Sequence, residues 1–239
     1  LAGNSLLLQI DDLGGTIGGS ANITSAVSGS ATADNITFNI LGSSGAALDS
    51  AINVIGGTYD VASQFLSTID GDGAITFTDA SINADILKAG VFGNNGALTV
   101  GGGTLSGNTE LKLYAPGSNG MINFVSNVTL NSESNVILAG NTVTINNGVV
   151  VTITGDDGAD AFVFTNNPNY TGSGGNGSTT GMFDGNGAQT FPLDQAPPFD
   201  NQQDSSVTLA AISPVTPDQP STVTPGATGE ARKGGSFTS

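Results

Sequence analysis

Three aspartates in the first half of the sequence have a residue type and spacing that suggest calcium chemistry. Asp70, Asp72 and Asp79 lie in the stretch DGDGAITFTDA, where oxygen ligands at a glycine-rich turn suit Ca²⁺. The match to an EF-hand loop is partial, because the first ligand position falls on Thr68, which lacks a carboxylate. A second acidic cluster, DDGAD, occupies residues 156–160. The pattern therefore leaves two alternatives, a weak calcium site or solvated acids at turns, and no other cofactor is expected.

Residues suited to catalysis are scarce. The 239 residues include no His, no Cys and only four basic residues, namely Lys88, Lys112, Arg232 and Lys233. Glu110 lies two residues before Lys112, and Asp85 lies near Lys88, so we expect solvated ion pairs on an outer face. We therefore expect no enzymatic activity. The net charge of −16 argues against binding to nucleic acid or to an anionic membrane surface.

The composition favours short β-strands joined by tight turns. The chain has 36 glycines, no Trp, three Tyr and 37% hydrophobic residues, so its core must be largely aliphatic. No stretch approaches the roughly 18 apolar residues of a membrane span. The sequence begins at Leu1 without Met or an apolar leader, and we expect a processed chain that is soluble or attached to a surface.

A polar turn followed by an alternating strand recurs along the chain. The copies are DGDGAITF at 70–77, GNNGALTV at 93–100 and GSNGMINF at 117–124. Alternation places every second residue of each strand on the inward side. Three sides of inward residues are expected. The first contains Ile75, Leu98 and Ile122 and, two residues further along each strand, Phe77, Val100 and Phe124. The second contains Ile82, Leu105 and Val128, and the third contains Leu87, Leu111 and Val136.

These columns predict an all-β protein, a right-handed parallel β-helix of about six coils with three short sides each. We expect the β-helix over residues 1–165, with repeated strands to about residue 154, and an extended Gly/Asn/Pro-rich tail over 166–239. Asp72, Asn95 and Asn119 occupy equivalent corners, where we expect turns that need a positive φ. The apolar segment SVTLAAI at 206–212 is expected to add to a sheet edge as a strand.

One outward column raises the question of ice binding. Its members are Thr76, Thr99, Asn123 and Thr144. The positions two residues further along are Thr78, Gly101, Val125 and Asn146. They do not form a regular second column, which argues against ice binding.

Three phrases of the sequence resemble a known family. LKLYAPGSNGMINFVSNVTL, ILAGNTVTINNGVVVTI and NPNYTGSGGNGSTTGMF resemble the C-terminal β-solenoid region of large secreted bacterial β-strand-repeat proteins, some of which carry an upstream FecR-type domain. The resemblance covers roughly residues 4–200. The pattern of strands and turns is more loosely similar to filamentous-haemagglutinin-like adhesins. The resemblance implies a right-handed β-helix displayed on the exterior of a bacterial cell, and it supplies no motif of functional residues.

Both ends of the predicted column are apolar and lack a capping pattern. The first coil opens with NSLLLQI and the last repeated strand is GVVVTI, with no amphipathic helix beside either. We therefore expect a structural subunit that stacks head to tail into an extracellular bacterial fibre or surface layer, with its tail contacting a neighbour. A carbohydrate-binding or carbohydrate-active surface protein is the alternative function. Two structural alternatives also stay open: a fragment of a longer protein whose upstream repeats cover the first coil, and a tail folded onto its own coils. The expected assembly residues are Leu6, Leu7, Leu8, Ile10, Val149, Val151, Val207, Leu209 and Ile212.

Overall fold

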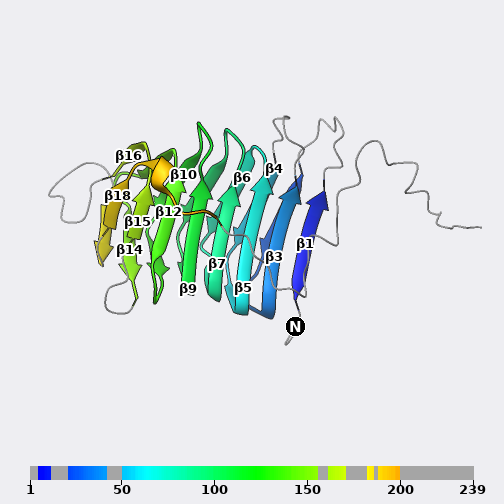
Figure 1. Ribbon diagram of the computed structural model, residues 1–239. Coiled ribbons are helices and arrows are strands. Elements are labelled where there is room, and N and C mark those ends of the chain that lie inside the picture. Colours follow the sequence, from blue (N-terminus) through cyan, green and yellow to red (C-terminus); the bar gives the residue numbers. More distant parts are fainter. Residues whose placement is uncertain are drawn as a thin grey trace, which may run out of the picture.

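The computed structural model describes residues 5–11, 21–41, 50–155, 161–170, 182–185 and 188–199. Within these ranges the regular structure is almost entirely β-strand, and the one helical element is a 3₁₀ turn, η1 (Leu193–Gln195). The strands stack from β1 to β18 as a parallel β-solenoid of about six turns (Figure 1). The expected fold class is confirmed. None of the helices in the described ranges is long and apolar enough to cross a membrane.

The strands belong to two sheets, and every strand pairing is parallel. The smaller sheet contains β2 (Asn22–Ala26), β4 (Ser50–Ile55), β6 (Gly73–Thr78), β8 (Ala97–Gly101), β10 (Met121–Ser126), β13 (Thr142–Ile145) and β16 (Asn167–Asn169). The larger sheet begins with β1 (Leu6–Asp11), β3 (Ser30–Leu41), β5 (Thr58–Asp70), β7 (Ser81–Val91) and β9 (Thr104–Ala115). It continues with β11 (Val128–Asn131), β12 (Val136–Gly140), β14 (Val150–Thr154), β15 (Ala161–Phe164), β17 (Met182–Gly185) and β18 (Ala188–Phe191).

The long strands of the larger sheet each cover two sides of a coil. Their registers shift between Ala33 and Asn35 and again between Ala84 and Ile86, and such bulges bend a strand. Beyond β9 the same two sides are made by separate strands, first β11 and β12 and then β14 and β15. We call the smaller sheet the first side. The second side consists of the N-terminal halves of the long strands together with β11, β14 and β17. The third side consists of β1, the C-terminal halves of the long strands, β12, β15 and β18.

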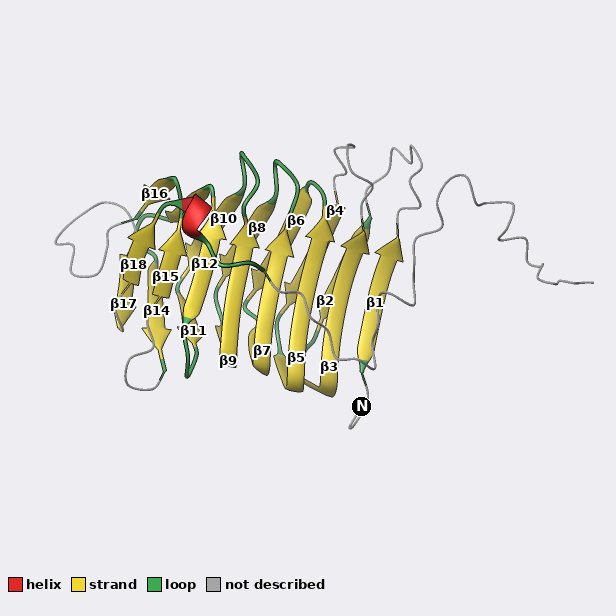
Figure 2. Cartoon of the chain, in the orientation of Figure 1, coloured by secondary structure: helices red, strands yellow, loops and turns green. Residues whose placement is uncertain are grey.

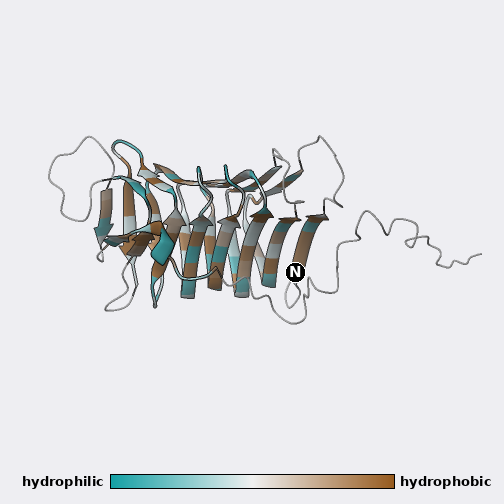
Figure 3. Ribbon diagram, turned by 45° about the horizontal axis from the view of Figure 1, so that its top comes forward, coloured by the Kyte–Doolittle hydropathy of each residue, from teal (hydrophilic) through white to brown (hydrophobic). Residues whose placement is uncertain are grey.

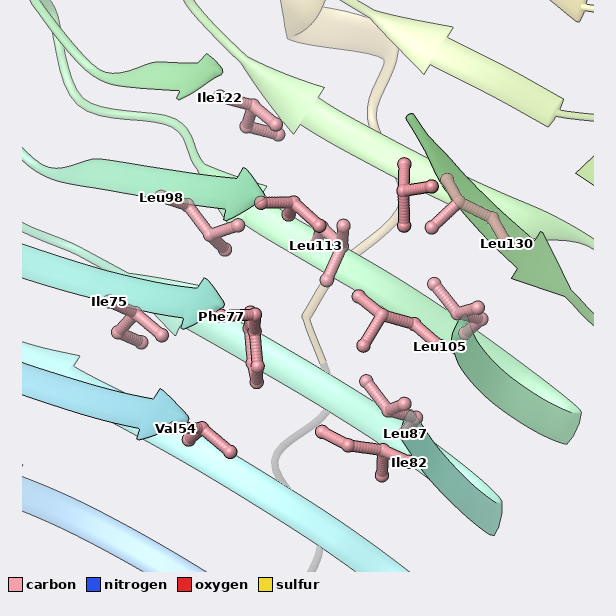
Figure 4. Close-up of a cluster of buried hydrophobic side chains, with 14 of the residues drawn as sticks. Val54, Ile75, Phe77, Ile82, Leu87, Leu98, Leu105, Leu113, Ile122 and Leu130 are labelled. Atoms are coloured by element: carbon pink, nitrogen blue, oxygen red, sulfur yellow. The ribbon is translucent and has the colours of Figure 1, made fainter. Parts of the chain in front are cut away.

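The core lies between the three sides and is built from stacked aliphatic and phenylalanine side chains. Hydrophobic and hydrophilic residues alternate along the strands, so one set points inward (Figure 3). Ile75, Leu98 and Ile122 stand opposite one another in successive strands and are fully buried (Figure 4). The column of Leu87, Leu111 and Val136 is likewise confirmed.

The second predicted column is wrong at its last member. Leu105 stands opposite Leu130, whereas Val128 stands opposite Val151 in the next coil. The register shifts between Phe124 and Ser126, where one strand carries an extra residue. Both Val128 and Leu130 are buried, because an error of two residues keeps a side chain on the same face of the strand.

The corners at Asp72, Asn95 and Asn119 are held by side-chain hydrogen bonds, whereas the corners between the first and second sides use left-handed glycines such as Gly56 (φ 62°) and Gly102 (φ 93°). Asp72, Asn95 and Asn119 do occupy successive corners, but the only described non-glycine residue with a positive φ is Asp79, at 50°. Instead, Asn95 Nδ2 donates to Asp72 Oδ2 over 2.6 Å, and Asn119 Nδ2 donates to Asn95 Oδ1 over 2.9 Å. Glycine is needed at Gly117 for close approach, since an added Cβ would lie 2.0 Å from a carbonyl oxygen of the preceding coil.

The solenoid extends further than the sequence pattern indicated. Strands β16, β17 and β18 follow residue 165 and pair with β13, β14 and β15. The boundary expected at residue 165 therefore falls inside the stack, and the strands continue to Phe191. The strand pattern was hard to see here because β16 is only three residues long and contains proline.

Candidate functional site

Residues 192–199, which we call the strap, leave the last strand and cross the outer surface of the third side. Figure 2 shows the strap passing from η1 in front of β12 and β9. The Tyr114 hydroxyl donates to the Pro197 carbonyl oxygen over 2.7 Å, and Lys112 Nζ donates to the Pro198 carbonyl oxygen over 3.2 Å. The described start of the tail therefore lies on its own coils.

The strap ends on a small aromatic cluster. The Phe199 ring lies 5.0 Å from that of Phe92 and 5.1 Å from that of Tyr114, measured between ring centroids. An added Cβ at Gly90 would lie 3.2 Å from Phe199 and 2.5 Å from Phe92, so glycine makes room for the rings. The sequence analysis missed this cluster. A signal was present, because Tyr114 follows the inward Leu113 and so had to point outward.

Beneath the strap lies a cluster of three ionisable side chains from two neighbouring coils. Lys88 and Lys112 stand opposite each other in β7 and β9, and Glu110 Oε2 lies 2.9 Å from Lys88 Nζ and 3.0 Å from Lys112 Nζ. The expected pair of Glu110 and Lys112 is therefore present, but Lys88 is 3% exposed and Lys112 is 8% exposed, so the expectation that the ion pairs are solvated is wrong. The expected partner Asp85 lies in the bulge of β7, whereas Glu110 belongs to the adjacent coil.

The cluster has a defined charge state. Burial by itself raises the pKa of Glu110, but hydrogen bonds and charge from Lys88 and Lys112 outweigh it and hold the pKa below its usual value. Burial and the nearby Glu110 charge raise the pKa of Tyr114. At neutral pH Glu110 is therefore ionised and Tyr114 keeps the proton that it donates to the strap. This arrangement can anchor a polypeptide segment, but it does not pair two carboxylates across a groove as glycoside hydrolysis requires.

The three aspartates considered for calcium are not brought together. Asp70 ends β5 and Asp72 lies in the following turn, while Asp79 lies at the far end of β6, about 20 Å along the strand. Both Asp72 oxygens accept hydrogen bonds from Asn95, which together lower the pKa of Asp72. Across the described ranges, no group of three or more His, Cys, Asp or Glu residues could hold a metal ion. The DDGAD cluster at 156–160 lies outside the described residues.

The expected assembly residues fall into three groups. Leu6 and Ile10 pack against the core from β1, Leu8 stands opposite the core residue Phe38, and Leu7 stands opposite Thr37 on the outer face. Val149 and Val151 are buried, because β17 lies beyond them, so they are not at the end of the stack. Val207, Leu209 and Ile212 lie outside the described residues.

Comparisons of the chain with protein-family models, with curated proteins and with solved structures found no match. The resemblance to secreted β-strand-repeat proteins therefore stays an expectation from the sequence.

Proposed function

We propose that this chain is a structural subunit of an extracellular bacterial fibre or surface layer, in which solenoids stack end to end. The observation that carries the proposal is the open N-terminal end of the core. Leu8 points inward and stands opposite Phe38, yet Leu8 is 41% exposed whereas Phe38 is 0% exposed. A large apolar side chain that lies in line with core residues yet remains exposed to solvent is typical of a solenoid end onto which a further coil packs.

The strand edges support the same proposal. Among the described strands β1 pairs with β3 alone, and at the other end β17 pairs with β14 alone and β18 pairs with β15 alone. Such edges template further strand pairing unless they are covered, and no covering helix is found in the described parts of the chain. Because the two ends differ, the contact between subunits is heterologous and propagates.

The tail has a narrower role in this proposal than the sequence suggested. Residues 192–199 bind their own coils, so any contact with a neighbour falls to the chain beyond Phe199. Tyr114 gives the carbohydrate alternative no support, because this outward-facing ring is 3% exposed beneath the strap.

The experiment compares two charged substitutions on the same strand. Leu8→Asp places a carboxylate on the open core end, and Leu7→Asp places it on the outer face of β1. We expect the wild-type protein and Leu7→Asp to form fibres by light scattering and electron microscopy, and Leu8→Asp to stay monomeric. A folded wild-type chain that sediments as a monomer at high concentration would overturn the proposal.

A further inference from the structure

The second side carries two outward rows of hydrogen-bonding side chains that neither the strap nor the proposed end contact uses. The first row has one hydroxyl in each coil: Ser30, Thr58, Ser81, Thr104, Thr129 and Thr152. The second row, two residues further along each strand, contains Thr32, Asp60, Asn83, Ser106, Asn131 and Thr154. Ser106 is buried at 8% exposure, and the other five are half-buried or exposed. The strand register thus forms a two-dimensional array that spacing alone did not reveal.

The array is regular because the backbone sets both of its repeats. Neighbours within a row belong to adjacent parallel strands, about 4.8 Å apart, and the two rows are separated by two residues, about 6.6 Å. The intervening side chains point inward: Tyr59, Ile82, Leu105, Leu130 and Ile153 are at most 1% exposed. A packed core therefore holds each strand of the array in place.

Side-chain bonds between coils further order the rows. Thr154 Oγ1 donates to Asn131 Oδ1 over 2.9 Å, and Ser30 Oγ donates to Asp60 Oδ2 over 3.3 Å. Ordering these groups before binding reduces the entropy lost when a ligand binds.

The chemistry of the array selects its ligand. Asp60 is the one charged member, so the surface does not suit a phosphate or another polyion. The array also contains no aromatic ring on which a sugar could stack. The ligand that fits must be neutral, must donate and accept hydrogen bonds, and must itself repeat in two directions. We propose that the second side binds the water lattice of an ice crystal.

The first side lacks these properties. Its column of Thr76, Thr99, Asn123 and Thr144 is confirmed by the register, but the adjacent positions are Ala74, Ala97 and Met121, the last 39% exposed. The sequence argument against ice binding holds for that side and does not apply to the second side. The ice-binding array lies within one chain, so the inference is independent of fibre formation.

The test measures thermal hysteresis and the shaping of ice crystals by the full chain, at concentrations where sedimentation shows monomer. Thr104→Tyr places a bulky ring at the centre of the array, and Thr99→Tyr makes the same change on the first side as the matched control. Both threonines are half-buried outward residues, and thermal melts followed by circular dichroism establish that each variant folds.

We expect hysteresis in the wild-type chain and in Thr99→Tyr, and its loss in Thr104→Tyr. If Thr104→Tyr fails to fold, Thr129→Tyr in the same row replaces it. The proposal is wrong if the folded wild type gives neither hysteresis nor crystal shaping, or if the two variants lose hysteresis equally. Co-sedimentation with microcrystalline cellulose without ice activity would also overturn it.

Discussion

Replacing Glu110 with glutamine tests whether the ion cluster beneath the strap stabilises the third side. The change removes the carboxylate that lies 2.9 Å from Lys88 Nζ and 3.0 Å from Lys112 Nζ. Breaking a buried ion pair by removing one partner costs about 3–5 kcal/mol. The Glu110 side chain is 30% exposed, so we expect the lower end of the range, about 3 kcal/mol. For a chain of this size the melting temperature should fall by about 6–12 °C.

The pH dependence gives the prediction a second readout. The pKa of Glu110 is lower in the folded chain than its ordinary value of 4.5. The stabilisation by Glu110 is therefore complete above that value and is lost as the pH falls through the folded pKa. The difference in melting temperature between the wild type and Glu110→Gln should be largest at neutral pH and should shrink as the pH falls below 4.5 and through the folded pKa. Thermal melts followed by circular dichroism measure both quantities.

A triple variant provides the control. Lys88→Met, Glu110→Leu and Lys112→Met together replace the whole cluster by apolar side chains of similar size, so no buried ammonium group remains. Such replacements are often neutral or stabilising, and we expect the triple variant to melt above Glu110→Gln. If Glu110→Gln melts at the wild-type temperature at neutral pH, the cluster does not contribute to stability and the reasoning is refuted.

The remaining predictions concern the strap, the core and the hydrogen-bonded corner residues Asp72, Asn95 and Asn119, which we call the corner ladder. Phe199→Ala removes two aromatic pairs worth about 0.5–1.5 kcal/mol each, so the free energy of unfolding measured in urea should fall by about 1–3 kcal/mol. Amide hydrogen exchange over β9 should become faster, and unchanged exchange would contradict the contact between the strap and the third side. Val100→Asp places a carboxylate in the core between Phe77 and Phe124 at a cost of several kcal/mol, so the cooperative melt should disappear, and a melt near the wild-type temperature would refute the inward column. Asp72→Ala removes the first acceptor of the corner ladder and should lower the free energy of unfolding. Hydrogen bonds from Asn95 lower the pKa of Asp72, so the difference in unfolding free energy between wild type and variant should shrink as the pH falls. A difference that does not change with pH would argue against this account.

The fold could be predicted because the side of a strand on which a residue lies depends only on alternation. Ile75, Leu98 and Ile122 were assigned inward from a period of two, and the same rule kept Val128 on the correct face when its partner was misassigned. The exact register was not predictable, because the bulge at residues 124–126 lengthens one coil without a clear signal in composition.

The strap could not be predicted, because its contacts depend on the path of the chain through space. The residues joined by the Lys112–Pro198 hydrogen bond are 86 positions apart, and neither belongs to a motif that indicates the other. Similarly, an Asn at a repeated corner suits either a positive φ or a side-chain ladder, and the sequence does not distinguish them. Only the observed φ values and the bond from Asn119 to Asn95 favour the ladder.

The residue types in the corner ladder limit charge repulsion between the stacked coils of this strongly acidic chain. Two carboxylates on adjacent coils, about 4.8 Å apart, would repel each other by about 1 kcal/mol even in water. The ladder avoids this repulsion because Asp72 is followed by Asn95 and Asn119, whose amide groups donate hydrogen bonds to the coil before them. In the proposed fibre the net charge of −16 would oppose lateral association of neighbouring columns, so we expect single fibres rather than bundles.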